Sequence, residues 1–185
     1  MSKGKLFVIS GASGVGKSTV LKEVMKNRED LLFSVSATTR APRDGEQEAV
    51  SYYFVTNETF QAMIARGEFL EYDGHMDNWY GTPVGQLEEK LSRGNVILDI
   101  EPNGAFAVRK ARPDATLIFI APPSMEELER RLRSRGDTPE AQITLRLERA
   151  AWEMEQAPKY NHTVINDQVK TCADHILKII AQVAD

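Results

Sequence analysis

The sequence has 185 residues, 42% of them hydrophobic, and a formal net charge of −4 at pH 7. A chain of this size and composition can bury one sizeable core, so we expect a single domain over residues 4–183. The acidic balance argues against a general surface for nucleic acid or for anionic membranes. The single cysteine, Cys172, excludes an internal disulfide, and the sequence shows no leader pattern or long apolar run. These features predict a soluble cytoplasmic protein.

Residues 5–26 have the pattern of a buried strand, a glycine-rich turn and a helix. The turn fits G-x-x-x-x-G-K-[ST], a phosphate-binding loop in which glycine lets the backbone N–H groups approach and surround an anion. The start of the helix adds the positive end of its dipole. Lys17 is expected to reach the β- and γ-phosphates of a nucleotide, and the Ser18 hydroxyl to bind Mg²⁺. The predicted loop and helix start comprise Gly11, Ala12, Ser13, Gly14, Val15, Gly16, Lys17, Ser18 and Thr19.

A polar segment, residues 37–48, follows a predicted strand at 33–36. It carries Arg40 and Arg43, which by themselves indicate a solvated basic loop. Beside a phosphate-binding loop the same two residues favour an anion site, because a guanidinium group binds phosphate oxygens in a bidentate manner and stays charged.

A helix is predicted over residues 83–93, with Thr82 as its N-cap and Pro83 at its first position. Before it the pattern predicts a strand at 54–55, a helix at 57–66, a strand at 67–72 and a loop through His75 and residues 78–81. The apolar run at 96–101 ends in acids and includes Asp99. Downstream of a phosphate loop, such a strand is expected to supply a carboxylate on the Mg²⁺ side.

The second half of the chain is more regular. Residues 115–121 form a fully buried strand, and Ser124 with Glu127 has the pattern of a capping box for a helix that runs to residue 136. Further elements are predicted as a helix from 139, a strand at 162–165 and a helix at 169–183. The arginines of the two middle helices indicate either a mobile basic lid or Arg–Glu pairs on solvated faces.

The alternation of strands and helices predicts an α/β fold with a parallel sheet and right-handed crossovers. In such a sheet ligands gather at the carboxyl ends of the strands. The phosphate loop at the end of the first strand therefore marks the expected site.

From Lys5 to Ile180 the chain resembles guanylate kinases of the nucleoside-monophosphate kinase group, which are P-loop NTPases. The segments that carry the resemblance are SGASGVGKST (10–19), FSVSATTRAPRDGE (33–46), FLE (69–71), NWYGT (78–82), ILDIE (97–101), IFIAPPS (118–124), RLRSRG (131–136) and VIND (164–167). The resemblance implies a core with the ATP loop at 11–18, a GMP-binding excursion at about 34–94 and a helical lid at about 126–155. It also implies phosphorylation of GMP, and of dGMP, to the diphosphate with ATP as co-substrate and Mg²⁺.

The resemblance also implies roles for individual residues. The GMP phosphate would be bound by Arg40, Arg43, Tyr52 and Tyr80, and the guanine would be surrounded by Ser36, Glu71, Thr82 and Glu101. Catalysis would involve Lys17 with the arginines Arg131, Arg135 and Arg146, while Asn166 would contact the adenine and Asp99 would lie near Mg²⁺ and substrate. Chemistry supports Glu71 independently, because one carboxylate can accept from N1–H and the 2-amino group of guanine but finds no such pair on adenine. A paired polar site of this kind discriminates by roughly 10⁴-fold.

The chain departs from the family pattern at several places. Ala49 and Asp77 stand where glycine is usual, and Trp79 where tyrosine is usual. Glu101 stands where aspartate is typical, and residues 102–103 differ as well. If the backbone needs φ > 0 at Ala49, alanine there adds strain.

Two other functions stay open at this level: a related sugar-phosphate kinase, and a non-catalytic guanylate-kinase-like binding module. The first would be expected to lack the set of Ser36, Arg40, Arg43 and Glu71, and the second typically lacks the phosphate loop. The sequence leaves both monomer and homodimer open.

Overall fold

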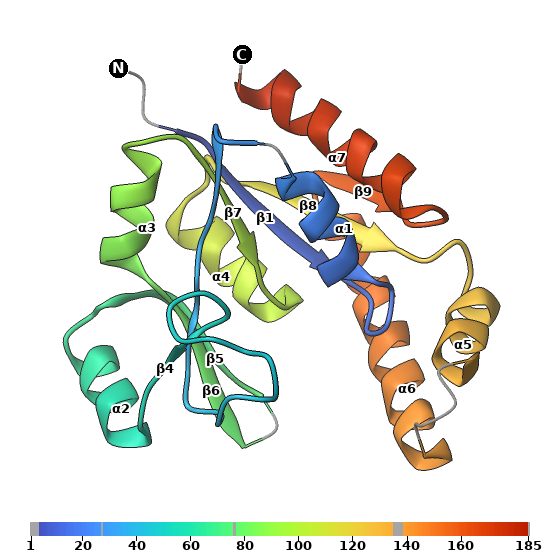
Figure 1. The fold of residues 1–185 in the computed structure, drawn as a ribbon, viewed down its shortest axis with the longest axis horizontal. Coiled ribbons are helices and arrows are strands. Elements are labelled where there is room, and N and C mark those ends of the chain that lie inside the picture. The colour runs from blue at the N-terminus through green and yellow to red at the C-terminus, as the bar shows by residue number, and fades with distance from the viewer. Residues whose placement is uncertain (1–3, 27, 76, 135–138, 185) are drawn as a thin grey trace.

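The computed structural model describes residues 4–26, 28–75, 77–134 and 139–184. Two sheets organise the fold, a five-stranded parallel sheet and a smaller four-stranded one (Figure 1). The prediction of an α/β fold around a parallel sheet is therefore confirmed. Among the described helices, none combines the length and the apolar character needed to cross a bilayer.

The large sheet has the strand order β2-β7-β1-β8-β9, and every pairing in it is parallel. Its strands are β1 (Leu6–Gly11), β2 (Leu31–Phe33), β7 (Asn95–Asp99), β8 (Thr116–Ala121) and β9 (His162–Ile165). All six residues of β1 and all six of β8 are buried. Their unbroken apolar runs suit strands that are covered on both faces, and this burial places β1 and the loop after it at the centre of the molecule.

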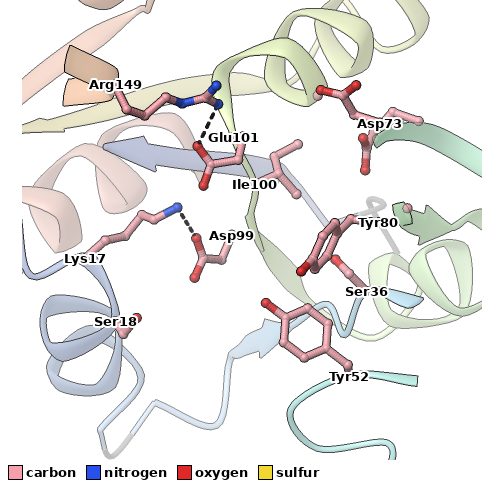
Figure 2. A pocket seen from close by; sticks show the side chains of 13 residues that line it. Lys17, Ser18, Ser36, Tyr52, Asp73, Tyr80, Asp99, Ile100, Glu101 and Arg149 are labelled. Atoms are coloured by element: carbon pink, nitrogen blue, oxygen red, sulfur yellow. Dashed lines mark ion pairs between the residues drawn. The ribbon is translucent and has the colours of Figure 1, made fainter. Parts of the chain in front are cut away.

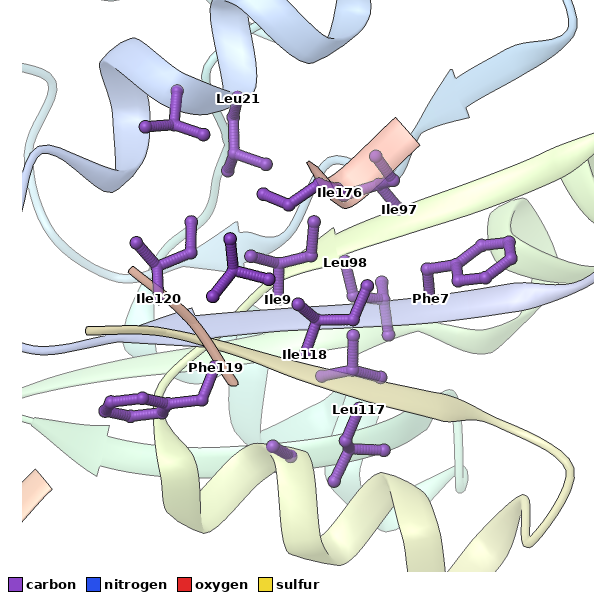
Figure 3. Packing of buried hydrophobic residues seen from close by; sticks show 14 of the residues in the cluster. Phe7, Ile9, Leu21, Ile97, Leu98, Leu117, Ile118, Phe119, Ile120 and Ile176 are labelled. Carbon is purple, nitrogen blue, oxygen red and sulfur yellow. The ribbon is translucent and has the colours of Figure 1, made fainter. Parts of the chain in front are cut away.

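Helices cover both faces of the large sheet. They include α1 (Lys17–Met25), α3 (Val84–Leu91), α4 (Pro102–Ala111) and α7 (Val169–Ala184). Figure 3 shows Leu21 of α1 and Ile176 of α7 on the same side of the sheet as Ile9, while Leu117 and Phe119 point to the other side. Cys172 is buried on α7, as expected for a residue that packs the closing helix.

The smaller sheet has the order β4-β3-β6-β5. Its strands are β3 (Ala37–Thr38), β4 (Tyr53–Phe54), β5 (Phe69–His75) and β6 (Asn78–Pro83), and α2 (Asn57–Ala65) accompanies it. Phe60 of α2 is fully buried and stacks on Phe69 with ring centroids 4.5 Å apart. This aromatic contact holds α2 against the small sheet (Figure 1).

Two further helices project from the core on the other side of the molecule, α5 (Met125–Ser134) and α6 (Glu140–Gln156) (Figure 1). A short 3₁₀ helix, η1 (Ala157–Lys159), follows α6. The Ser124 hydroxyl accepts the N–H of Glu127, so this half of the predicted capping box is confirmed. Arg133 pairs with Glu129 and Glu140, as predicted for charges on solvated helix faces.

Three local predictions are wrong. The strand expected at 33–36 is split, because the chain leaves the large sheet after Phe33 and enters the small sheet at Ala37. The loop expected through 78–81 is strand β6, which pairs with both β3 and β5. The third wrong prediction is that Thr82 is a helix N-cap. Thr82 lies in β6, and α3 starts at Val84 after Pro83. In addition, helix α4 was not anticipated.

Ala49 and Asp77 both adopt positive φ angles, 60° and 62°. The strain expected for alanine at position 49 is therefore present. The left-handed region costs a residue with a Cβ roughly 1–2 kcal/mol, although aspartate tolerates it better than alanine. In the same turn the Ala49 N–H donates to the carbonyl of Tyr52 at 2.9 Å, so the strained residue supports the loop that carries Tyr52.

We expect Ala49→Gly to raise the free energy of unfolding by about 1 kcal/mol, because glycine removes the Cβ clash. The greater conformational entropy of glycine in the unfolded chain offsets part of this stabilisation. Urea denaturation of both proteins measures the difference. Ala65→Gly, at the exposed end of α2, is the matched control and should lower stability instead. Equal losses in the two variants would contradict the assignment of strain to position 49.

Candidate active site

Two adjoining pockets open at the carboxyl ends of β1 and β7. The first, which we call the acceptor pocket, has a volume of 290 Å³ and is lined by Lys17, Ser18, Ser36, Tyr52, Glu71, Asp73, Tyr80, Gly81, Asp99, Ile100, Glu101, Gly104 and Arg149 (Figure 2). The second, which we call the loop pocket, has a volume of 860 Å³ and is lined by residues 11–19, Arg43, Glu101, Gln142, Leu145, Arg146, Arg149 and Glu153. The two share Lys17 and Ser18, so a group bound at the loop lies between two compartments.

The predicted phosphate loop has the backbone that an anion site needs. Gly14 has a φ of 84°, and a Cβ there would lie 2.6 Å from the Leu132 side chain, so position 14 requires glycine. Helix α1 begins at Lys17, which directs its N-terminus at the loop. The amide nitrogen of Asn166, a side chain 3% exposed, donates to the Val15 carbonyl at 2.7 Å. Asn166 therefore braces the loop from the end of β9, in addition to the adenine contact that the family resemblance implies.

Lys17 forms an ion pair with Asp99 at the end of β7, with 2.5 Å between Nζ and Oδ1 (Figure 2). Burial by itself lowers the pKa of Lys17, but the negative charges of Asp99, Glu101 and Glu153 outweigh it and hold the pKa above its usual range. Lys17 is therefore a permanent cation. The structure thus brings together the lysine of the loop and the acid predicted to lie near the metal.

The far end of the acceptor pocket contains Glu71, whose side chain is only 7% exposed. Burial raises the pKa of this carboxyl, and the hydrogen bond from Thr82 opposes the shift only in part. The Thr82 hydroxyl donates to Oε1 at 2.6 Å. Thr82 is fully buried and does not line the pocket, so its hydroxyl contacts Glu71 and not the pocket itself.

Gly104 of α4 lies against the same carboxylate. A Cβ at this position would come within 2.7 Å of Oε2 of Glu71. The glycine therefore leaves the space that Oε2 of Glu71 occupies.

The four residues predicted to bind the acceptor phosphate do not all line the same pocket. Tyr52 and Tyr80 line the acceptor pocket, with ring centroids 6.0 Å apart, but Arg43 lines the loop pocket. Arg40 lies 5.4 Å above the Tyr52 ring and pairs with Glu46 at 2.8 Å. Arg40 is thus held beside the tyrosines without lining either pocket.

Of the arginines predicted to belong to a lid, only Arg146 is a described residue that lines a pocket. Arg146 lines the loop pocket, whereas Arg131 donates to the backbone carbonyl of Asn166 at 2.8 Å and to Glu127. Arg135 lies outside the described residues. Arg149 lines both pockets and was not among the predicted site residues, although its spacing of three from Arg146 puts the two on one helix face.

Comparisons with known proteins agree with this geometry. A family model described as guanylate kinase matches residues 3–183. The chain belongs to the guanylate kinase family. It is 44% identical to a guanylate kinase of Clostridioides difficile, an alignment that covers 98% of this chain and 89% of that protein. It is 47% identical to a guanylate kinase of Thermus thermophilus, with 96% and 80% covered. The crystal structure of guanylate kinase from Anaplasma phagocytophilum has a TM-score of 0.81 and 33% identity, and covers 100% of this chain and 88% of its own.

In this member of the guanylate kinase family, a buried carboxylate joins α6 to the phosphate loop. Glu153, 1% exposed, accepts the Ser13 N–H at 2.6 Å and the Arg149 Nε–H at 2.8 Å. Arg149 also reaches Glu101 at 3.5 Å (Figure 2). Glu101, predicted to face the guanine, therefore pairs with helix α6. No sequence pattern indicates a bond between residues 13 and 153, and sequence reasoning missed Glu153.

Burial and the neighbouring Glu101 carboxylate raise the pKa of Glu153 to about 7 from an ordinary value of 4.5. Between these two values the folded protein binds more protons than the unfolded chain, so the contribution of Glu153 to the free energy of unfolding falls as the pH rises. We expect the stability of the parent relative to Glu153→Gln to fall between about pH 5 and 8. Urea denaturation across this range measures it. Glu155→Gln, an exposed neighbour on α6, should show no such slope, and a flat difference for Glu153→Gln would contradict the expectation.

The described residues contain no group of three or more histidine, cysteine or acidic side chains arranged to hold a metal ion. Ser18 and Asp99 nevertheless both line the acceptor pocket and both offer oxygen. Mg²⁺ prefers oxygen ligands and in kinases is bound by one or two side chains together with substrate phosphates. The donor set at the loop therefore fits Mg²⁺ that arrives with a nucleotide.

Proposed function

We propose that this chain transfers the γ-phosphoryl group of ATP to GMP, giving ADP and GDP, and that dGMP is also an acceptor. The observation that carries the proposal is the buried Glu71 carboxylate at one end of a pocket that has Lys17 and Ser18 at the other. A pocket of this kind holds a base and its phosphate at once. Membership of the guanylate kinase family supports the same acceptor.

Glu71 would read the base. Guanine presents N1–H and the 2-amino group side by side, and one carboxylate can accept from both. Adenine lacks this pair and would leave a buried carboxylate without partners, which costs more than a lost hydrogen bond. Thr82, behind Glu71, fixes the orientation of the carboxylate, and Ser36 lines the pocket nearby.

The phosphates would meet at the mouth that the two pockets share. Backbone N–H groups of residues 11–19, Lys17 and Arg146 would bind ATP. Asn166, which braces the loop, would contact the adenine as the family resemblance implies. Tyr52 and Tyr80, helped by Arg40 and Arg43 in the loop beside them, would bind the acceptor phosphate. Ser18 and Asp99 would hold Mg²⁺, which supplies neutralisation of charge on the transferring group.

During transfer an oxygen of the GMP phosphate bonds to the γ-phosphorus while the bond from the γ-phosphorus to the β–γ bridging oxygen breaks. Phosphoryl transfer of this kind depends on positioning and electrostatic stabilisation more than on covalent catalysis. The acceptor phosphate is already an anion, and the described residues around both pockets include no histidine. Lys17, Arg146 and Arg149 would stabilise the charge in the transition state, together with Arg131 and Arg135 in the proposed lid.

We propose that residues 4–183 act as one domain with three parts: the core with the ATP loop, the GMP-binding region at about 34–94, and the lid at about 126–155. Closure of the lid would exclude water, so that the phosphoryl group passes to GMP instead of being hydrolysed. The proposed setting is the cytoplasm, where ATP and GMP are both available.

A coupled assay of ADP release tests the function. ATP and Mg²⁺ are offered with GMP, dGMP, AMP, UMP, CMP or ribose 1,5-bisphosphate in parallel. Turnover on GMP and dGMP alone is the expected result. Turnover on the sugar phosphate would instead support the related kinase class, and silence on every acceptor with ATP still bound would support a binding module.

A further inference from the structure

A second carboxylate, Asp73, lines the acceptor pocket beside Glu71. The two residues are two apart on strand β5, so their side chains lie on the same face of the strand. Their partners on β6 are Tyr80 and Thr82, and Tyr80 also lines the pocket. No role follows for Asp73 from the sequence motifs.

The charges of the acceptor pocket divide into two ends. Its lining cations, Lys17 and Arg149, pair with Asp99 and Glu101 near the phosphate loop. At the other end the described donors to Glu71 and Asp73 are neutral groups: a hydroxyl, a backbone N–H and an amide. Burial raises the pKa of Glu71, and the charge of Asp73 raises it further. This end therefore suits a ligand edge that is rich in hydrogen-bond donors.

The carboxylate of Asp73 is held in place from two sides. Its Oδ1 accepts the N–H of Gly74 at 2.8 Å, and its Oδ2 accepts from the side-chain amide of Asn103 at 3.2 Å. Asn103 lies in the first turn of α4, beside Gly104. Each carboxylate oxygen can accept more than one hydrogen bond, so both contacts leave capacity for a ligand.

We propose that Asp73 is a second specificity-determining residue, which accepts the hydrogen of the guanine 2-amino group that Glu71 leaves unpaired. The inference rests on the proposed function, since it concerns the acceptor of that same reaction. Glu71 accepts N1–H and one hydrogen of the amino group, and the other hydrogen needs an acceptor when the base is buried. Hypoxanthine keeps N1–H but has no amino group. Asp73 therefore distinguishes GMP from IMP through the 2-amino group alone, whereas Glu71 also reads N1–H, which GMP and IMP share and AMP lacks.

The substitution Asp73→Asn isolates this role. Asparagine keeps one side-chain oxygen that can accept from Gly74 or Asn103, but it replaces the other oxygen with an amino donor that faces the donor on the base. We expect kcat/KM for GMP to fall about 10- to 100-fold while kcat/KM for IMP stays within about two-fold, because a hydrogen bond to a charged acceptor is lost for GMP alone. The KM for ATP should not change. Asp174→Asn, an exposed aspartate on α7, is the matched control.

Two further measurements distinguish base recognition by Asp73 from a contact with the ribose and from a purely structural role. If Asp73 accepts from the ribose 2′-hydroxyl, Asp73→Asn will lower the preference for GMP over dGMP and leave the preference over IMP unchanged, which overturns the proposal. If Asp73 only ties β5 to α4, both Asp73→Asn and Asn103→Ala will reduce GMP and IMP turnover equally, which also overturns it. Absence of GMP turnover in the parent protein would refute the proposed function itself, a result distinct from an unchanged GMP/IMP ratio.

Discussion

Replacing Lys17 by alanine is expected to reduce turnover of GMP by roughly 10³-fold at saturating ATP, because the charge that neutralises the transferring phosphoryl group is removed. The ion pair between Lys17 and Asp99 is lost at the same time, so the negative charge of Asp99 would repel the ATP phosphates. Initial rates of ADP release measure the effect.

Lys22→Ala is the control for this experiment. Lys22 lies on the same helix, α1, but is exposed and lines neither pocket. Its replacement should leave turnover unchanged, and far-ultraviolet circular dichroism and thermal melting should show that both variants fold. Retention of near-parental activity by Lys17→Ala would remove the phosphate loop from catalysis.

Glu71→Gln should lower kcat/KM for GMP by roughly 10²- to 10⁴-fold and leave the background rate with AMP unchanged. A glutamine amide has one acceptor oxygen, and its amino group would face the donors of guanine. The parent should also lose GMP activity as the pH falls, starting above the usual range of a glutamate because burial raises the pKa of Glu71. This acidic loss should be absent from Glu71→Gln. Parallel kcat/KM measurements on GMP and AMP across pH test both expectations.

Glu58→Gln, at the exposed start of α2, makes the same chemical change in the same region and should have no effect on acceptor choice. An unchanged ratio of GMP to AMP in Glu71→Gln would exclude Glu71 from base recognition.

Local patterns were sufficient for the elements at the centre of the fold. The apolar runs of β1 and β8 need burial on both faces, and this need alone places them inside a parallel sheet. The spacing of glycines before Lys17 determines a loop whose backbone can surround a phosphate. Family resemblance added Glu71, and the structure places it in the pocket that adjoins this loop.

Local patterns failed where a residue takes its conformation from a distant partner. Thr82 with Pro83 has the pattern of a helix start, but pairing with β5 extends the strand to Pro83, and the Thr82 hydroxyl bonds to Glu71. Strand β3 has only two residues, so it gains its stability from its neighbours and carries little pattern of its own.

The sequence by itself determined a parallel α/β core and the pattern of a phosphate loop, because each depends on residues close together in the chain, whereas the proposed base-reading role of Glu71 came from the family resemblance. Only the tertiary structure decided that Glu153 holds Ser13, that Arg149 reaches Glu101 and that Asn103 donates to Asp73, which lines the acceptor pocket. These contacts join residues 30 to 140 positions apart. Their formation depends on how packing of the buried core brings the elements together, which no local pattern encodes.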